Sequence, residues 1–203
     1  MSKSLPQISE WKRVFVDTSF IIDSVSTLKE DLPKFQAVDR TQKLLEHLKL
    51  SASKKEQKIT WVTSSIVLSE LTKFENKDAV EELQKIFDSP DLEIINFTRK
   101  EARLLIDDLE KYIEPKHISV YLKELKKTLA NNDIYNPKNV ISNDALIIAC
   151  AKSKRCDVVL TSDKNSFLKI AHKVELPILN SEDIPLNSMD YIEYEKPIFT
   201  DYD

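Results

Sequence analysis

The amino-acid sequence predicts an α/β fold in which helices cover both faces of a mainly parallel β-sheet. Short stretches expected to be strands alternate along the chain with longer amphipathic stretches expected to be helices. Each strand candidate is also apolar along nearly its whole length, as strands buried on both faces are. The strand candidates are residues 13–16, 59–63, 92–95, 158–160 and, at an edge of the sheet, 176–179.

The first strand candidate leads directly into the polar triplet Asp17-Thr18-Ser19, and an apolar helix begins after it. Asp17 is therefore expected at the carboxyl end of a strand, which is the edge where parallel sheets bind ligands. A simpler alternative is that Asp17 only caps the following helix. Residues 1–12 are polar and are expected to be a flexible N-terminal segment.

The helix after the second strand candidate places Glu70 on one stripe with Val67 and Leu71. A buried carboxylate without a partner is costly, so Glu70 at such a position points to a cation or a pairing base. The structural alternative is an ion pair between Glu70 and Lys73 or Arg13.

The segment from residue 140 to residue 167 carries two more acids in unusual positions. Ser142 is a suitable N-cap for a helix that is apolar nearly all round, and Asp144 shares a stripe of that helix with Ile147 and Ile148. Asp163 then follows the buried strand candidate at 158–160. The preceding residues 131–139 are expected to form a polar loop.

Asp17, Glu70, Asp144 and Asp163 are therefore expected to converge at one edge of the sheet. Crowded carboxylates repel one another unless a cation enters. With no His or Cys nearby, such oxygen ligands favour Mg²⁺ or Mn²⁺ over zinc or copper. A site of this kind suits phosphodiester hydrolysis, because a metal ion can activate a water and neutralise the departing oxygen.

The composition narrows the class of protein. The 203 residues suffice for one domain with additions. No apolar run approaches a membrane span and the N-terminus lacks a signal-peptide core, so we expect a cytoplasmic protein without a membrane partner. Two Cys without a CxxC pattern and three His indicate neither a disulfide framework nor a zinc site. Glycine is absent, which excludes a Gly-rich phosphate loop and leaves Asn or Asp for turns with positive φ.

Four segments of the chain resemble, in order, the motif blocks of the PIN-domain family. They are Val-Phe-Val-Asp17-Thr-Ser, Thr-Ser-Ser-Ile-Val-Leu-Ser-Glu70-Leu, Asn-Asp144-Ala-Leu-Ile-Ile-Ala-Cys-Ala and Leu-Thr-Ser-Asp163-Lys-Asn-Ser-Phe. The resemblance covers residues 13 to about 180. It implies a three-layer α/β/α fold and a metal-dependent endoribonuclease whose four acids hold the metal, with Thr18 and Thr161 positioning ligands or a water. It extends to the VapC-type toxins of toxin–antitoxin pairs, which implies an antitoxin protein and a second copy of the chain as candidate partners.

The chain also departs from this family pattern. It is longer than the compact toxins, so we expect a PIN-like nuclease domain over residues 13–185 with helical insertions near 24–58 and 115–139, and a C-terminal tail at 186–203. Asn165 stands where many members carry a further acid, which is expected to weaken a second metal site. The candidate phosphate contacts for an RNA substrate are Lys54, Lys55, Lys126, Lys127, Lys164 and Lys169.

Two other functions compete with the nuclease. One is a catalytically silent PIN-like module that binds RNA or a protein and has little affinity for metal. The other is a hydrolase of the phosphoaspartate type, since Asp17 follows the first strand. That class needs a second Asp two residues after the nucleophile, where this chain has Ser19.

Overall fold

The computed structural model describes residues 8–27, 35–55, 58–73, 77–112, 137–164, 167 and 176–184. The elements run in the order η1 (Ile8–Glu10), β1 (Arg13–Val16), α1 (Thr18–Val25), α2 (Phe35–Lys55), β2 (Thr60–Ser64), α3 (Ser65–Leu71), α4 (Lys77–Phe87), β3 (Leu92–Ile95), α5 (Arg99–Tyr112), α7 (Pro137–Ser153), β4 (Val158–Thr161), β5 (Ile178–Asn180) and η2 (Ser181–Asp183), where η denotes a 3-10 helix.

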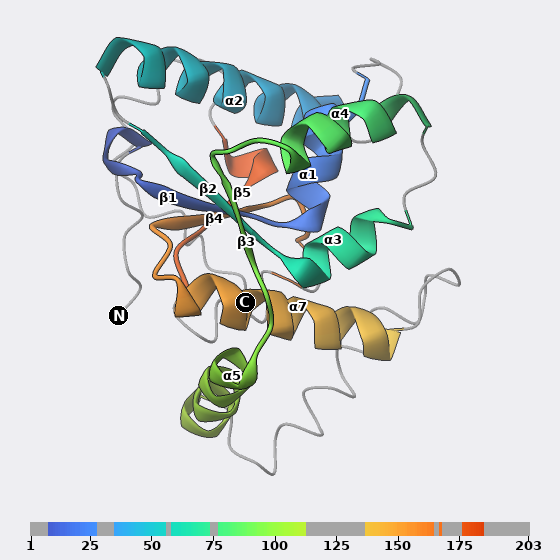
Figure 1. Ribbon diagram of the computed structural model, residues 1–203, viewed down its shortest axis with the longest axis vertical. Coiled ribbons are helices and arrows are strands. Elements are labelled where there is room, and N and C mark those ends of the chain that lie inside the picture. The colour runs from blue at the N-terminus through green and yellow to red at the C-terminus, as the bar shows by residue number, and fades with distance from the viewer. Residues whose placement is uncertain are drawn as a thin grey trace.

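The five strands form one parallel sheet in the order β3-β2-β1-β4-β5. β1 lies at the centre, where Phe15 pairs with Val62 of β2 and with Val159 of β4. Figure 1 shows α2 and α4 on one side of the sheet and α7 with α5 on the other. The fold is therefore the three-layer α/β/α arrangement with a parallel central sheet that the sequence predicts.

The central strands are apolar because helices cover both of their faces. Val14 and Phe15 of β1 and Val158 and Val159 of β4 are fully buried. The run from Ile147 to Ala151 in α7 is buried too, which agrees with a helix packed between the sheet and α5.

The N-terminal segment and α7 differ from what the sequence predicts. Ile8 and Trp11 are buried in the core, so the flexible segment expected over residues 1–12 is wrong for residues 8–12. α7 begins at Pro137 rather than after Ser142, so residues 137–139 of the expected loop are helical. Proline is favoured at the first position of a helix because it lacks only an N–H that would have no helical partner. Asp144 is consequently an interior residue of the helix.

The turn from α7 into β4 shows how a chain without glycine makes a left-handed residue. Arg155 has φ 51°, and Cys156 N donates to Ala151 O at 3.4 Å, as in a helix end closed by a left-handed residue. The expectation that Asn or Asp would fill such positions is wrong at this turn. Residues 131–136 of the expected polar loop, most of the 115–139 insertion and the tail at 186–203 lie outside the described residues.

In the ranges described above, no helix combines the length and the apolar composition that a membrane span requires.

Candidate functional site

Three of the four candidate acids follow the ends of parallel strands. Asp17 directly follows β1, and its backbone N donates to Leu160 O of the neighbouring β4 at 3.0 Å. Asp163 comes two residues after β4 ends at Thr161. Glu70 lies in α3, which begins where β2 ends.

The side chain of Asp17 is held by hydroxyl groups from two elements. Its Oδ2 atom accepts hydrogen bonds from Ser19 Oγ at 2.7 Å and from Thr161 Oγ1 at 2.8 Å, and these hydroxyl oxygens lie 3.1 Å apart. Ser19 Oγ also accepts from Ser162 N at 2.8 Å. Asp17 does occupy the N-cap position of α1, but its carboxylate makes no cap hydrogen bond to that helix. The carboxylate is thus bound to Ser19 of α1 and to Thr161 at the end of β4, and it does not serve as a helix cap.

Burial makes the ionised form of Asp17 unfavourable. The residue is 4% exposed. Burial raises the pKa of its carboxyl to about 6, while the hydroxyls of Ser19 and Thr161 oppose this rise and the negative charge of Asp163 adds to it. Asp17 and Asp163 are therefore close enough to interact as like charges.

Glu70 is half-buried and bonds to groups from two other helices. Thr18 Oγ1 of α1 donates to Glu70 Oε2, and Asn143 Nδ2 of α7 donates to Glu70 Oε1 at 2.7 Å. The alternative of an ion pair with Arg13 is wrong, because Arg13 binds Glu93 of β3 at 2.5 Å instead. Within the described part of the chain, Lys73 forms no ion pair with Glu70 either.

Asp144 and Asp163 complete the predicted set. Asp144 is 7% exposed in α7, directly after Asn143. Asp163 is half-buried, and its backbone N donates to Thr161 Oγ1 at 3.1 Å. Thr161 thus contacts both Asp17 and the backbone of Asp163, and its role in positioning ligands or a water stays a prediction. Asn165 lies outside the described residues.

The structure brings the predicted acids together in part. Among the described residues, no group of three His, Cys, Asp or Glu side chains is arranged to hold a metal ion. Asp17 and Asp163 interact through their charges. Glu70 is hydrogen-bonded to Thr18, the residue after Asp17, and to Asn143, the residue before Asp144. A metal held by all four acids thus stays a prediction.

Hydroxyl groups also connect this edge to the end of β5. Ser162 Oγ lies against Ser181 Oγ of η2, and Ser181 Oγ donates to Thr161 O at 3.2 Å. Lys164 forms an exposed ion pair with Glu182 of η2. The other lysines predicted to contact phosphate, Lys54, Lys55, Lys126, Lys127 and Lys169, have no described side chains.

Sequence reasoning did not assign Ser19 and Asn143 to this site. Both are polar residues inside the quoted motif blocks, Ser19 two residues after Asp17 and Asn143 one residue before Asp144. Their position beside predicted metal ligands was the sequence feature that could have assigned them to the site. Their partners could not be predicted, since the bond from Asn143 to Glu70 joins residues 73 positions apart.

A comparison with protein families agrees with this fold. The family model described as PIN domain matches residues 14–173. A similar solved structure is titled "Crystal structure of VapBC2 from Rickettsia felis bound to a DNA fragment from their promoter"; the match is 22% identical, covers 83% of this chain and 98% of that chain, and has a TM-score of 0.44. That likeness is too distant to carry a functional argument, and no curated protein gives a significant match. PIN domains are generally nucleases that use divalent metal ions. Because the family model spans most of the sequence, the chain belongs to the PIN-domain family.

Proposed function

We propose that this protein is an endoribonuclease that hydrolyses RNA phosphodiester bonds with the help of Mg²⁺ or Mn²⁺. The observation that carries the proposal is the interacting pair Asp17 and Asp163 at the carboxyl ends of two adjacent strands, in a domain of a family of nucleases. Two neighbouring carboxylates, of which Asp17 is buried and Asp163 half-buried, would be stabilised by a cation. The resemblance to VapC-type toxins supports an antitoxin protein and a second copy of the chain as proposed partners. The proposed location is the cytoplasm.

The donor set fits a hard divalent ion. Asp17, Glu70, Asp144 and Asp163 offer only carboxylate oxygens, which suit Mg²⁺ and Mn²⁺ better than zinc or copper. When bound, such an ion would activate a water and neutralise charge on the departing oxygen. These four acids are the residues that would hold it.

The surrounding residues would orient those acids and the substrate. Ser19 and Thr161 fix one oxygen of Asp17. Among the lysines predicted to contact phosphate, Lys164 is the one whose side chain the structure describes, and it is exposed next to Asp163. A phosphate of RNA that bound Lys164 would displace Glu182 from it. Charged donors at this rim would act on the backbone of any RNA sequence rather than read its bases.

RNA cleavage tests the proposal directly. A mixed pool of structured and single-stranded RNA is incubated with the parent protein in Mg²⁺, in Mn²⁺ and in EDTA, beside the variants Asp17→Asn, Asp144→Asn and Asp91→Asn. Asp91 is the matched control, because it forms an exposed ion pair with Lys58 before β3 begins. We expect cleavage that requires metal, is lost in the first two variants and survives in the control.

Two results would contradict the nuclease. One is cleavage by Asp17→Asn at the rate of the parent. The other is a folded parent that cuts nothing in either metal and gains no thermal stability from Mn²⁺.

One observation favours a catalytically silent RNA-binding module as a second candidate. No three acidic side chains in the described ranges are arranged around a common cation, and both carboxylate oxygens of Glu70 already accept hydrogen bonds. A silent module predicts that the protein binds RNA equally well in EDTA and in Mn²⁺ and leaves it uncut. Fluorescence anisotropy with labelled RNA, followed by electrophoresis of the same samples, separates the two functions.

A further inference from the structure

Two neutral donors from distant parts of the chain hold the carboxylate of Glu70. Thr18 Oγ1 donates to Glu70 Oε2, and Asn143 Nδ2 donates to Glu70 Oε1 at 2.7 Å. We call these three residues the Glu70 clamp. Each donor is the chain neighbour of another candidate metal ligand, since Thr18 follows Asp17 and Asn143 precedes Asp144. The clamp therefore connects the segments that carry three of the four candidate ligands.

The chemistry of the clamp leaves Glu70 able to bind a cation. An ionised carboxylate has about four lone-pair sites and donates nothing, so the amide of Asn143 must present its nitrogen to it. The clamp uses one site on each oxygen and leaves a site free on each. Both donors are neutral, so the clamp places no positive charge beside Glu70. A lysine in the place of Asn143 would hold Glu70 equally well but would cancel the negative charge of an ionised carboxylate.

We infer that Asn143 is a positioning residue that, together with Thr18, fixes the carboxylate of Glu70 in the orientation in which it binds the divalent ion. The inference rests on the proposed function, since it needs a metal at this site. With a donor on each oxygen, the carboxylate plane is set from two sides. Without Asn143, the plane can turn about the remaining bond to Thr18. Groups that orient metal ligands in this way typically change metal affinity by about 10- to 100-fold when they are removed.

Binding of Mn²⁺ alone tests this role without reference to catalysis. The parent, Asn143→Leu and Asn96→Leu are titrated with Mn²⁺ while electron paramagnetic resonance measures the free ion. Asn96 is the matched control because it is exposed just after β3. We expect Asn143→Leu to raise the Kd for Mn²⁺ about tenfold and Asn96→Leu to leave it unchanged. A purely structural role for Asn143 would lower the melting temperature in EDTA and leave the Kd of the folded protein as it is.

The other arm of the clamp gives an independent test, which also serves if Asn143→Leu does not fold. Thr18→Val has nearly the same shape as the parent but lacks the hydroxyl, whereas Thr18→Ser keeps it. We expect Thr18→Val to weaken Mn²⁺ binding and Thr18→Ser to restore most of the parent affinity.

The outcomes separate this inference from the proposed function. If the parent binds Mn²⁺ and cuts RNA while Asn143→Leu and Thr18→Val bind Mn²⁺ with the parent Kd or more tightly, the positioning role is overturned and the nuclease stands. If the parent neither binds Mn²⁺ nor cuts RNA, both are overturned.

Discussion

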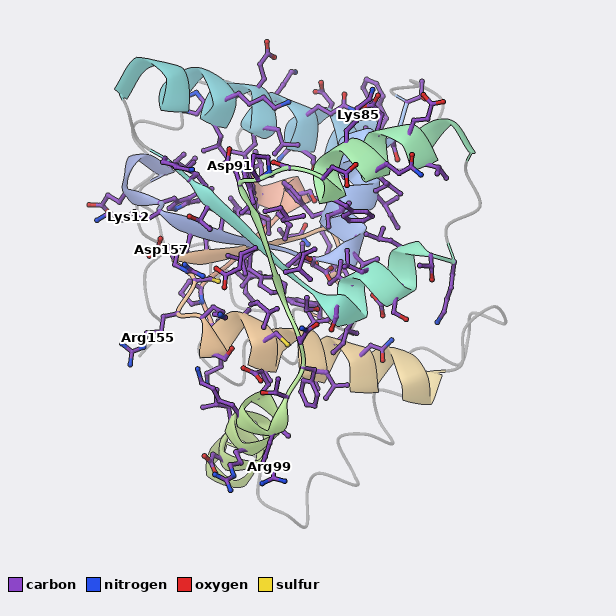
Figure 2. The ribbon with its side chains drawn as sticks, viewed as in Figure 1. Lys12, Lys85, Asp91, Arg99, Arg155 and Asp157 are labelled. Carbon is purple, nitrogen blue, oxygen red and sulfur yellow. The ribbon has the colours of Figure 1, made fainter. Side chains whose placement is uncertain are left out.

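The acids at the two ends of the central sheet have different kinds of partner. At the end where the strands begin, acids meet positive or strongly donating groups: Glu93 binds both Arg13 and Lys154, and the carboxylate of Asp157 accepts from the backbone N–H groups of Lys12 and Arg13. Figure 2 shows Lys12, Asp157 and Arg155 together at this end.

At the end where the strands finish, the acids are held by neutral groups. Hydroxyls hold Asp17, and a hydroxyl and an amide hold Glu70. In the described ranges, no lysine or arginine forms an ion pair with either acid. Lys164 and Glu182 also form an ion pair at this end, so the contrast concerns Asp17 and Glu70, whose described partners carry no positive charge.

The largest expected effect on the free energy of unfolding comes from replacing Asp17 by Asn. The pKa of Asp17 is about 6 in the folded protein and 3.8 ordinarily, so between these values the folded state binds more protons than the unfolded state. This group's contribution to the free energy of unfolding therefore decreases as the pH rises from about 4 through about 6. A pKa rise of this size corresponds to roughly 3 kcal/mol at pH 8.

Asp17→Asn should remove most of that cost. We expect the variant to be more stable than the parent at pH 8 in EDTA by up to roughly 3 kcal/mol, with the difference shrinking toward pH 4. Urea unfolding at several pH values measures it. A difference that stays constant across this range would show that the titration of Asp17 is not its source.

The same substitution at the other end should act in the opposite direction. Asp157 Oδ2 accepts from Lys12 N at 2.7 Å and from Arg13 N at 2.8 Å, and hydrogen bonds to a charged acceptor are stronger than those to an amide oxygen. We expect Asp157→Asn to lower the free energy of unfolding by about 1 kcal/mol at pH 8. Urea unfolding beside Asp17→Asn tests the comparison itself, which fails if both variants change stability in the same direction.

These two ends also show what the sequence can and cannot predict. The places of Asp17 and Asp163 were predictable because parallel strands end at one edge, so a residue that follows a strand has a known position. The partners of Glu70 were not predictable. The stripe of Val67 and Leu71 indicates which face of the helix turns inward, but it does not indicate which residues of other helices contact that face. Arg13 was a reasonable partner for Glu70 by charge, yet it lies at the beginning of β1 and Glu70 lies beyond the end of β2.

The burial of Trp11 could not be predicted from the sequence for a related reason. A single large apolar residue in a polar stretch has no periodicity, so its burial depends on the tertiary contact it makes. The start of α7 could not be predicted because two local signals compete. Ser142 is a suitable N-cap, but Pro137, five residues earlier, is a suitable first helical residue, and the helix begins there.

The smallest expected effect on stability concerns Arg155, which lies in the turn before β4, at the end of the sheet where the strands begin. Its φ of 51° is a conformation that costs an ordinary residue about 1–2 kcal/mol and glycine almost nothing. Glycine also loses about 0.5–1 kcal/mol more than other residues when the chain folds, which offsets part of the gain. We therefore expect Arg155→Gly to be more stable than Arg155→Ala by about 0.5 kcal/mol in urea unfolding. The alanine variant is the matched control, because it removes the exposed side chain but keeps the backbone restriction. If alanine is equally stable, the strain of the left-handed residue is no larger than the conformational entropy that glycine loses on folding, and the absence of glycine does not destabilise this turn.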